Sequence, residues 1–283
     1  MLVEIAIGDA YGAGFEYAKP SPDRPNDLSR YSKHPRHGIA PGAYTDDAQM
    51  SLAVAEALID HGADATTLQF TEKFVLAFKR DPREGYAGRF WEFLQSVSDA
   101  ADFAARIRPD SEKSGAAMRA CPIGVLSDVP SVLQVAERQA RITHATDGGV
   151  RSAQAVALAT HYFLHRLGGK AGLPAFLDAH IAGDWGRPHA GKAGAEGMTA
   201  VRAAITAIMA ERSLSALLRR CVDFTGDVDT VAAVALGAAS CSVEFAADLP
   251  EVLIAGLERG PWGMHYLRAQ DARLMALASP KGG

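Results

Sequence analysis

A run of small apolar residues at 231–241 constrains the fold of this chain more than any other stretch. Apart from Ser240, its residues are Val, Ala, Leu, Gly and Cys, so no face of a helix built from them would be polar. A helix that is apolar all round lies inside a protein, with other elements packed against every side. The sequence therefore predicts a buried helix here.

Two carboxylates and a hydroxyl stand directly ahead of that run, in Gly226-Asp227-Val228-Asp229-Thr230. A helix N-terminus favours negative charge, because its first N–H groups lack partners and the helix dipole is positive there. Capping explains one of the two aspartates. The same form recurs far upstream in Tyr44-Thr45-Asp46-Asp47, which opens a stretch with apolar residues at helical spacing.

If these two helix N-termini meet in space, four carboxylates share one pocket. Carboxylates at such short distances repel one another and raise one another's pKa, unless cations lie between them. Ligands that offer only oxygen suit Mg²⁺, Mn²⁺ or Ca²⁺ rather than zinc. The pattern therefore predicts a site for hard cations.

Composition excludes several classes of partner. The 283 residues are 48% hydrophobic, enough for the core of one large helical domain. The net charge is −4 and charged residues are spread along the chain, so nothing indicates nucleic acid or a membrane surface. We expect a small-molecule or protein substrate.

The three cysteines, Cys121, Cys221 and Cys241, lack the spacing of a disulfide framework or a thiolate metal site. The chain shows no leader segment and no apolar run of the roughly 18 residues that span a bilayer. These features favour a soluble cytoplasmic protein whose cysteines serve packing.

Helical periodicity recurs along the chain, and strict two-residue alternation is rare. We expect an all-α fold, a compact bundle of about a dozen helices. The predicted helices beyond the first are 46–62, 64–80, 90–103, 129–141, 150–165, 198–210, 213–222, 231–241 and 251–258.

The first 18 residues indicate a helix and turn that ends at a lone carboxylate, Glu16. Gly8, Gly12 and Gly14 would let another helix approach closely, or simply mark tight packing. Glu16 stands between Phe15 and Tyr17 and needs a partner or a metal. The proline-rich stretch 19–42 is a loop, either a lid or binding segment or a plain surface loop.

In the stretch 109–119, small polar residues precede an expected helix start. Such a start can bind an anion through its backbone N–H groups, or it can be an ordinary N-cap. The stretch lacks the glycine and lysine pattern of nucleoside-triphosphate loops. His144 has no Cys or second His at ligand spacing. On the sequence alone it is better interpreted as a hydrogen-bonded packing residue than as a catalyst.

Five motifs in order resemble the ADP-ribosylglycohydrolase family, which includes the dinitrogenase reductase-activating glycohydrolase and the ADP-ribosyl-acceptor hydrolases. They are Gly-Asp-Ala-Tyr-Gly-Ala-Gly-Phe-Glu at 8–16, Thr-Asp-Asp at 45–47, Ser-Gly-Ala-Ala-Met-Arg at 114–119, Thr-His at 143–144, and Gly-Asp-Val-Asp-Thr at 226–230. Single motifs of this kind are weak, whereas five in order are specific. The resemblance extends from Ile5 to about Gly263.

The resemblance implies one all-α domain over 1–283, with a dinuclear Mg²⁺ or Mn²⁺ centre at helix N-termini, that releases ADP-ribose from a protein or small-molecule acceptor. It implies three sets of site residues. The metal ligands are Thr45, Asp46, Asp47, Asp227, Asp229 and Thr230; the ADP-ribose contacts are Ser111, Ser114, Gly115 and His144; the catalytic residues are Glu16, Asp46 and Asp227. It leaves arginine, serine, O-acetyl and guanidine linkages open, and it specifies no oligomeric state.

The chain departs from the family pattern at two motif positions. Ala48 stands where many members have a fourth-position Thr, and Ser114 stands where asparagine is common. The changes bear on acceptor specificity more than on the metal ligands.

Two other classes of function compete with the glycohydrolase. The Asp-x-Asp-Thr pattern occurs in metal-dependent phosphohydrolases, although aspartyl-phosphate enzymes place the Thr one residue later. A non-catalytic ADP-ribose binder is the other alternative, which the complete ligand set disfavours.

Overall fold

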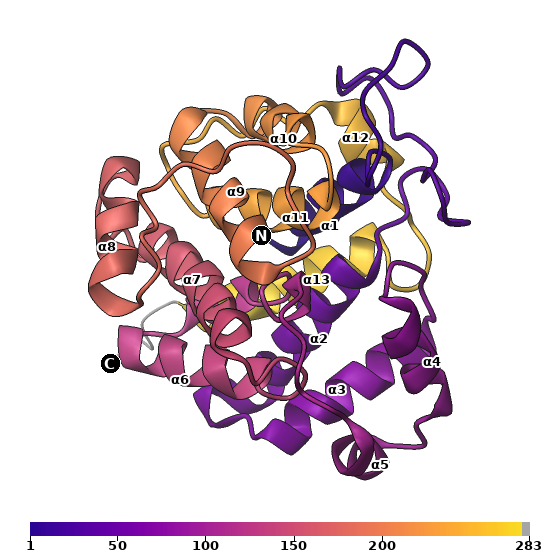
Figure 1. The fold of residues 1–283 in the computed structure, drawn as a ribbon, viewed down its shortest axis with the longest axis vertical. Coiled ribbons are helices and arrows are strands. Elements are labelled where there is room, and N and C mark those ends of the chain that lie inside the picture. The colour runs from indigo at the N-terminus through magenta and orange to yellow at the C-terminus, as the bar shows by residue number, and fades with distance from the viewer. Residues whose placement is uncertain (279–283) are drawn as a thin grey trace.

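A computed structural model of the protein describes residues 1–278, and every regular element in that range is helical (Figure 1). Residues 1–278 contain no β-strand, and their strand-like pairings are five isolated bridges between single residues. The all-α prediction is therefore confirmed.

Thirteen α-helices and four short 3₁₀ helices occur in the range described. The α-helices are α1 (Leu2–Ala13), α2 (Asp46–His61), α3 (Thr67–Arg80), α4 (Gly88–Ser96), α5 (Ala100–Arg106), α6 (Val129–Ala140), α7 (Asp147–Leu164), α8 (Leu173–His180), α9 (Gly197–Ala210), α10 (Leu214–Asp223), α11 (Val228–Ala239), α12 (Glu251–Gly256) and α13 (Met264–Met275). The 3₁₀ helices are η1 (Gly62–Asp64), η2 (Ser114–Ala116), η3 (Cys121–Val125) and η4 (Lys170–Gly172).

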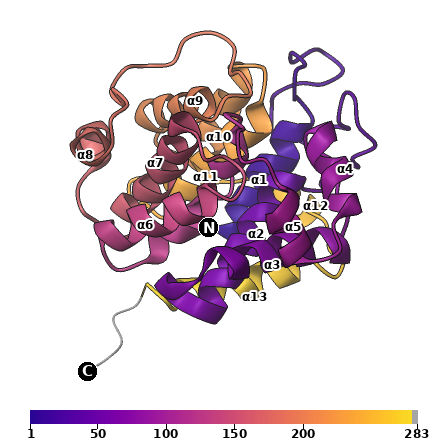
Figure 2. The ribbon, with the colours of Figure 1, turned by 60° about the horizontal axis from the view of Figure 1, so that its bottom comes forward.

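Helix α11 is the buried helix that the apolar run predicts. All twelve of its residues are buried, and α1, α7, α9 and α10 pack around it. Figures 1 and 2 both show α1 beside it. The helix begins at Val228, three residues before the predicted start, so Asp229 and Thr230 lie in its first turn and Asp227 is its N-cap.

The glycines of α1 allow its backbone to lie directly on that of α11. A Cβ added to Gly12 would lie 2.4 Å from Cα of Asp229, and one added to Gly8 would lie 2.6 Å from the carbonyl oxygen of Ala232. Glycine in a helix interior costs about 1 kcal/mol relative to alanine, so the close packing of two backbones must offset that cost here. The two helices are held in one fixed relation.

Helix α2 is the second element that places site residues. It begins at Asp46 and ends at His61, as predicted, and it packs against α1, α3 and α13. Thr45 is its N-cap, with extended backbone and a side chain that accepts the N–H of Asp47 at 3.4 Å. The N-termini of α2 and α11 therefore both adjoin α1.

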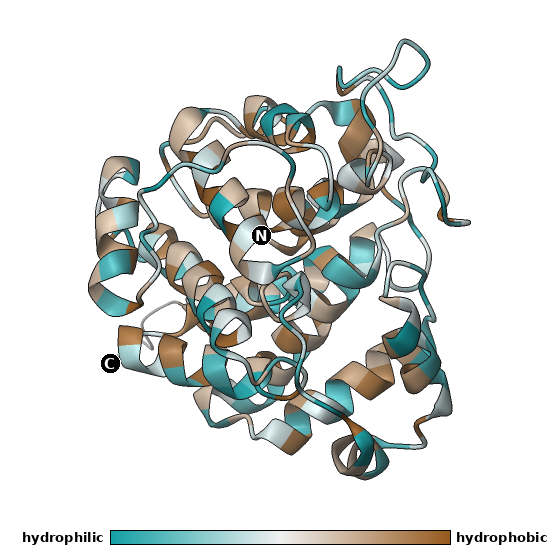
Figure 3. Cartoon of the chain, in the orientation of Figure 1, coloured by the Kyte–Doolittle hydropathy of each residue, from teal (hydrophilic) through white to brown (hydrophobic). Residues whose placement is uncertain are grey.

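The outer helices are amphipathic, whereas the central pair is apolar. In Figure 3, α1 and α11 are mostly brown, and α3 alternates between brown and teal. Phe70, Phe74 and Phe78 form the buried side of α3, whereas Leu68 is 48% exposed. Among the described helices, none is long and apolar enough to cross a lipid bilayer.

Several predicted boundaries were wrong because a capping residue starts a helix elsewhere. The predicted helix 90–103 is two helices, α4 and α5, since Asp99 accepts the N–H groups of Ala101 and Asp102 and starts the second. Helix α7 begins before position 150 because Thr146 accepts the N–H of Gly149. Thr66 likewise starts α3 at Thr67 rather than at 64.

Other differences concern elements near the chain's C-terminal half. Helices α8 and α13 were not predicted, and α12 ends at Gly256 rather than at 258.

All three cysteines are free thiols, and two of them, Cys121 and Cys221, are fully buried in the core. This agrees with the packing role that was expected of them.

Candidate active site

The N-termini of α2 and α11 meet, as the sequence predicts. Thr230 Oγ1, in the first turn of α11, donates a hydrogen bond of 2.8 Å to Oδ1 of Asp47, in the first turn of α2. Asp46, Asp47, Asp227 and Asp229 are all buried, and electrostatic repulsion links them to one another. The four carboxylates therefore share one region of the protein.

Glu16 joins this acidic group from the turn that follows α1. Carboxylate oxygens of Glu16, Asp227 and Asp229 lie within 4.8 Å of one another. The next residue, Tyr17, has a positive φ of 51° and donates its N–H to the carbonyl of Gly226 at 2.7 Å. This bond ties the turn of Glu16 to the residue that precedes Asp227.

Asp9, which the sequence analysis missed, supports the start of α2 from within α1. Its Oδ2 accepts the N–H groups of Thr45 at 2.8 Å and Ala48 at 2.9 Å, and its Oδ1 accepts the hydroxyl of Thr45 at 2.8 Å. Helix N-termini need such acceptors for their unpaired N–H groups. A carboxylate in the middle of a largely apolar helix is a signal that it has a buried partner, although it does not show which one.

Burial and mutual repulsion raise the pKa of every carboxyl in the acidic group for which a shift is resolved. Burial, and then the charge of Glu16, raises the pKa of Asp227 to about 6, and burial raises that of Asp9 to about 6. Burial and neighbouring carboxylates place the pKa values of Asp46, Asp47 and Asp229 well above the usual range. Positive charge at this place would remove the repulsion.

The donor atoms around this region suit hard divalent cations. They are carboxylate and hydroxyl oxygens, which Mg²⁺ and Mn²⁺ prefer. Thr45 gives its hydroxyl proton to Asp9 and Thr230 gives its own to Asp47, which leaves lone pairs on both hydroxyl oxygens. Asp227 is the N-cap of α11, yet its side chain makes no capping bond and is free for other contacts.

Of the residues expected to contact ADP-ribose, Ser114 touches Asp227, and Gly115 touches His144. Ser114 Oγ donates a hydrogen bond of 3.0 Å to Oδ2 of Asp227. A Cβ on Gly115 would lie 2.9 Å from Cε1 of His144, so the two residues are in contact. Ser111 lies on the same segment, and its carbonyl accepts the hydroxyl of Thr146 at 3.1 Å.

The expected helix start at 114 is only the short 3₁₀ helix η2. The N–H of Ser114 is bonded to the carbonyl of Ala195 at 2.9 Å, so it is not presented to an anion. Of the two alternatives for this stretch, an anion site or an ordinary N-cap, the bond to Ala195 removes this one N–H from the first.

His144 is held by a chain of hydrogen bonds that begins at the buried Arg119. Arg119 Nη2 donates to Oγ1 of Thr143 at 2.9 Å, and Thr143 Oγ1 lies 2.7 Å from Nδ1 of His144. Among the residues described, the Thr143 hydroxyl has no acceptor other than Nδ1 of His144, so it donates to Nδ1, and the ring proton of His144 is on Nε2. Burial, and then the charge of Arg119, lowers the pKa of His144 to about 3. His144 is therefore a neutral ring with an N–H donor at Nε2.

Comparison with known proteins identifies this arrangement. Residues 1–281 match the family model described as ADP-ribosylglycohydrolase. The chain belongs to the ADP-ribosylglycohydrolase family. A solved structure titled "ADP-ribosylglycohydrolase-related protein complex" has the same fold, with a TM-score of 0.73 and 23% identity over 98% of this chain and 95% of that chain.

Membership in the ADP-ribosylglycohydrolase family indicates glycohydrolase chemistry in general for this chain. The family consists of glycohydrolases that act on ADP-ribosylated substrates and generally depend on metal ions. In this member, Ala48 offers no side-chain hydroxyl, but its N–H still binds Asp9. The change from Thr therefore leaves the start of α2 fixed.

Proposed function

We propose that this ADP-ribosylglycohydrolase hydrolyses the bond between ribosyl C1 and an acceptor atom, releasing ADP-ribose, with two divalent cations, Mg²⁺ or Mn²⁺. The supporting observation is the oxygen cluster where α2 and α11 meet, joined by the bond from Thr230 to Asp47. Six residues at the two helix N-termini offer oxygen atoms as possible ligands: Thr45, Asp46, Asp47, Asp227, Asp229 and Thr230.

These six residues would hold the cations. Bound there, the cations would neutralise the buried carboxylates and lower the pKa of a water molecule. Ser114 fixes the orientation of Asp227 through its hydroxyl, so one carboxylate oxygen of Asp227 is committed and the other stays available.

The remaining side chains divide into substrate binding and proton transfer. The Nε2–H of His144, beside Gly115, would donate to an oxygen of ADP-ribose, and Ser111 and Ser114 would line the same subsite. Glu16 is the least buried carboxylate of the group, which suits a residue that meets substrate and moves a proton. The acidic side chains would stabilise the oxocarbenium-like charge that glycoside hydrolysis develops.

The test is release of ADP-ribose from an arginine-linked and a serine-linked ADP-ribosyl peptide, each with Mg²⁺, Mn²⁺ or a chelator. We expect release from at least one peptide, and only with the metal. Phosphate release without ADP-ribose release would favour a phosphohydrolase, and tight binding of ADP-ribose without turnover of any linkage would favour a non-catalytic binder.

The variant Asp227→Asn tests the role of this carboxylate in the reaction. It should abolish turnover while the protein stays folded, because it removes the negative charge and keeps the shape of the side chain. Asp147→Asn, at the exposed N-terminus of α7, should leave the rate unchanged. Full activity of Asp227→Asn would remove this carboxylate from the mechanism.

A further inference from the structure

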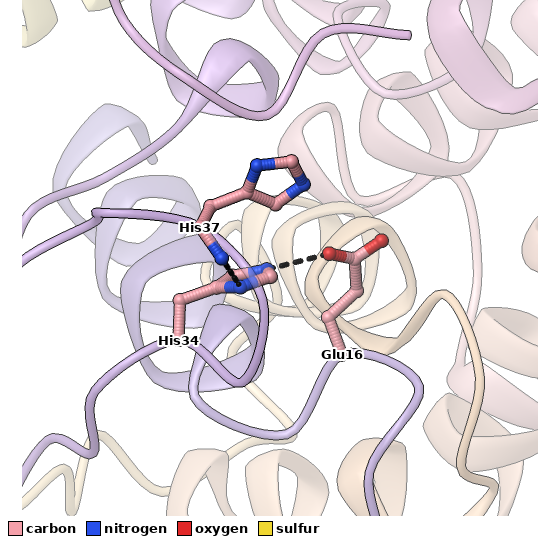
Figure 4. Close-up of side chains that lie close together, drawn as sticks. All are labelled: Glu16, His34 and His37. Carbon is pink, nitrogen blue, oxygen red and sulfur yellow. Dashed lines mark hydrogen bonds and ion pairs between the residues drawn. The ribbon is translucent and has the colours of Figure 1, made fainter. Parts of the chain in front are cut away.

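Glu16 also faces a second group of side chains, on the loop between α1 and α2. Figure 4 shows one carboxylate oxygen of Glu16 pointing at the ring of His34, with His37 beside it. His34 Nε2 lies 2.6 Å from Oε2 of Glu16, and the two histidine rings lie 4.7 Å apart. One ligand atom from each of Glu16, His34 and His37 lies within 4.8 Å of the other two, which is metal-binding distance.

The hydrogen bonds at the other ring nitrogen of His34 determine which form of the ring is present. Nδ1 accepts the backbone N–H of Arg36 at 3.0 Å and that of His37 at 2.9 Å. A nitrogen that accepts two N–H groups carries no proton of its own. The single ring proton of His34 is therefore on Nε2, where it is donated to Glu16.

This form of His34 argues against a metal ion held between the two histidines and Glu16. To bind a metal, Nε2 must present a lone pair, which moves the ring proton to Nδ1. The proton would then face the N–H groups of Arg36 and His37, so three donors would meet without an acceptor. The backbone turn at 34–37 thus fixes His34 as a donor toward Glu16.

We propose that His34 is a positioning residue that directs the carboxylate of Glu16 toward Asp227 and Asp229. Oε2 is engaged by His34, and within residues 1–278 no hydrogen bond is made to Oε1. The proposal rests on the proposed hydrolase function, because it gives Glu16 a defined orientation for proton transfer. His34 cannot itself take the proton from Glu16 while its Nδ1 is occupied by the turn.

Two contacts dock the loop on the turn of Glu16, and His34 is buried between the two segments. The side chain of His34 is 1% exposed, compared with 18% for Glu16. The backbone and side chain of Ser32 lie against Gly14, where a Cβ would come within 2.9 Å of Ser32 Cβ. The guanidinium of Arg36 lies 4.7 Å from the ring centre of Tyr17. Of the two alternatives for the loop 19–42, the structure thus favours a segment that belongs to the site.

Two variants of the full-length protein separate the two hydrogen-bonding roles of His34. In His34→Asn, the amide oxygen takes the place of Nδ1 and keeps the turn, but the side chain is too short to reach Glu16. In His34→Gln, the amide nitrogen takes the place of Nε2 and keeps the donor to Glu16. We expect His34→Asn to lower kcat roughly 10- to 100-fold with KM changed less than about threefold, and His34→Gln to recover most of the loss.

His37→Ala is the matched control, because His37 neighbours His34 but its ring faces the exposed Glu84. We expect its kcat to equal that of the wild type. Wild-type kcat in His34→Asn would overturn the proposal. It would also be overturned by equal losses in His34→Asn and His37→Ala together with one tightly bound Zn²⁺ per chain in calorimetric titration, since these results indicate a metal site.

Nitrogen NMR of the metal-free protein tests the contact without any substrate. We expect His34 to show the form protonated at Nε2, and the signal of that proton to move when Glu16 is changed to Gln. A form protonated at Nδ1 would overturn the proposal. If the wild type hydrolysed no ADP-ribosyl substrate, the proposed function would fail, and this measurement would still decide the contact between His34 and Glu16.

Discussion

Thr230 donates its hydroxyl to Asp47 across 183 residues of sequence. The two residues belong to α11 and α2, and both helices lie against α1. Asp9 of α1 binds the start of α2, and Gly12 of α1 lies on the start of α11. Helix α1 therefore sets the distance between the two groups of acidic residues, and changes in α1 should affect the site without touching a ligand.

Gly12→Ala tests the close contact of the central helices. The added methyl group would meet Cα and N of Asp229 and the carbonyl of Val228, all of them backbone atoms that cannot move aside. We expect a loss of about 1–3 kcal/mol or more in the free energy of unfolding, as overpacked cores show, together with loss of activity. Urea denaturation measures the first effect.

Gly88→Ala is the control for that substitution. Nothing lies within 4 Å of a Cβ at Gly88, the first residue of α4. This variant should be as stable as the wild type, or more stable by up to about 1 kcal/mol. Equal stability of the Gly12 and Gly88 variants would contradict the packing described for α1 and α11.

Asp9→Asn tests the support of Thr45. The asparagine oxygen can accept the N–H groups of Thr45 and Ala48, but its amide nitrogen must then donate to the hydroxyl of Thr45. That donation uses a lone pair that we propose binds a cation. We expect Mn²⁺ affinity to fall roughly 10- to 100-fold, as for other residues that orient metal ligands, with an unchanged circular dichroism spectrum. Calorimetry that gave wild-type affinity would argue against Thr45 as a ligand.

The raised pKa values of Asp9 and Asp227 predict how stability depends on pH in the presence of a chelator. Both carboxyls have a pKa of about 6 in the folded protein, above the ordinary aspartate value of 3.8. Between these values the folded state binds more protons, so the free energy of unfolding falls as pH rises through this range. The stabilising contribution is complete below pH 3.8 and lost above pH 6, and each group contributes on the order of 1 to 3 kcal/mol.

Urea denaturation of the chelator-treated protein at pH 5 and at pH 7 measures how the free energy of unfolding depends on pH. His144 opposes the trend, because its pKa is lowered to about 3 and its contribution is lost as pH falls below 6.5. The Asp227→Asn variant isolates one carboxyl, and its stability should depend less steeply on pH. Addition of Mg²⁺ or Mn²⁺ at pH 7 should raise the midpoint of the wild type, and no rise with either ion would count against the cation site.

Thr143→Val tests the hydrogen bonds that orient His144. Valine has the shape of threonine but leaves Nη2 of Arg119 and Nδ1 of His144 without their shared partner. We expect KM for an ADP-ribosyl substrate to rise about tenfold, which corresponds to one buried hydrogen bond lost. Thr160→Val is the control, since the hydroxyl of Thr160 donates to the carbonyl of Val156 in its own helix. Equal KM values in the two variants would exclude this role for Thr143.

The buried helix α11 and the starts of α2 and α11 could be predicted from the sequence because their signals are local. The apolar run of α11 and the hydroxyl-carboxylate pairs before α2 and α11 needed no knowledge of distant contacts. If the two starts met, repulsion between their carboxylates would favour cations between them. Their meeting is seen in the bond from Thr230 to Asp47, whereas the roles of the ligands stay predictions.

The missed features depend on contacts between distant segments. Asp9 serves a helix that begins 37 residues later, and nothing in its own helix shows that. His34 stands in a proline-rich loop, where its partner, Glu16, depends on how the loop folds back. The break between α4 and α5 was a local signal that helical periodicity outweighed, because Asp99 was not recognised as a cap.

The contact between the glycine face of α1 and the backbone of α11 also has a consequence during synthesis. Helix α1 leaves the ribosome before α11, and its partner surface begins at Val228, more than two hundred residues later. At about 5–20 residues per second, the apolar face of α1 waits on the order of 10 to 40 seconds for α11. For that interval the nascent chain exposes a surface that chaperones bind, so the rate of translation should influence the yield of folded protein.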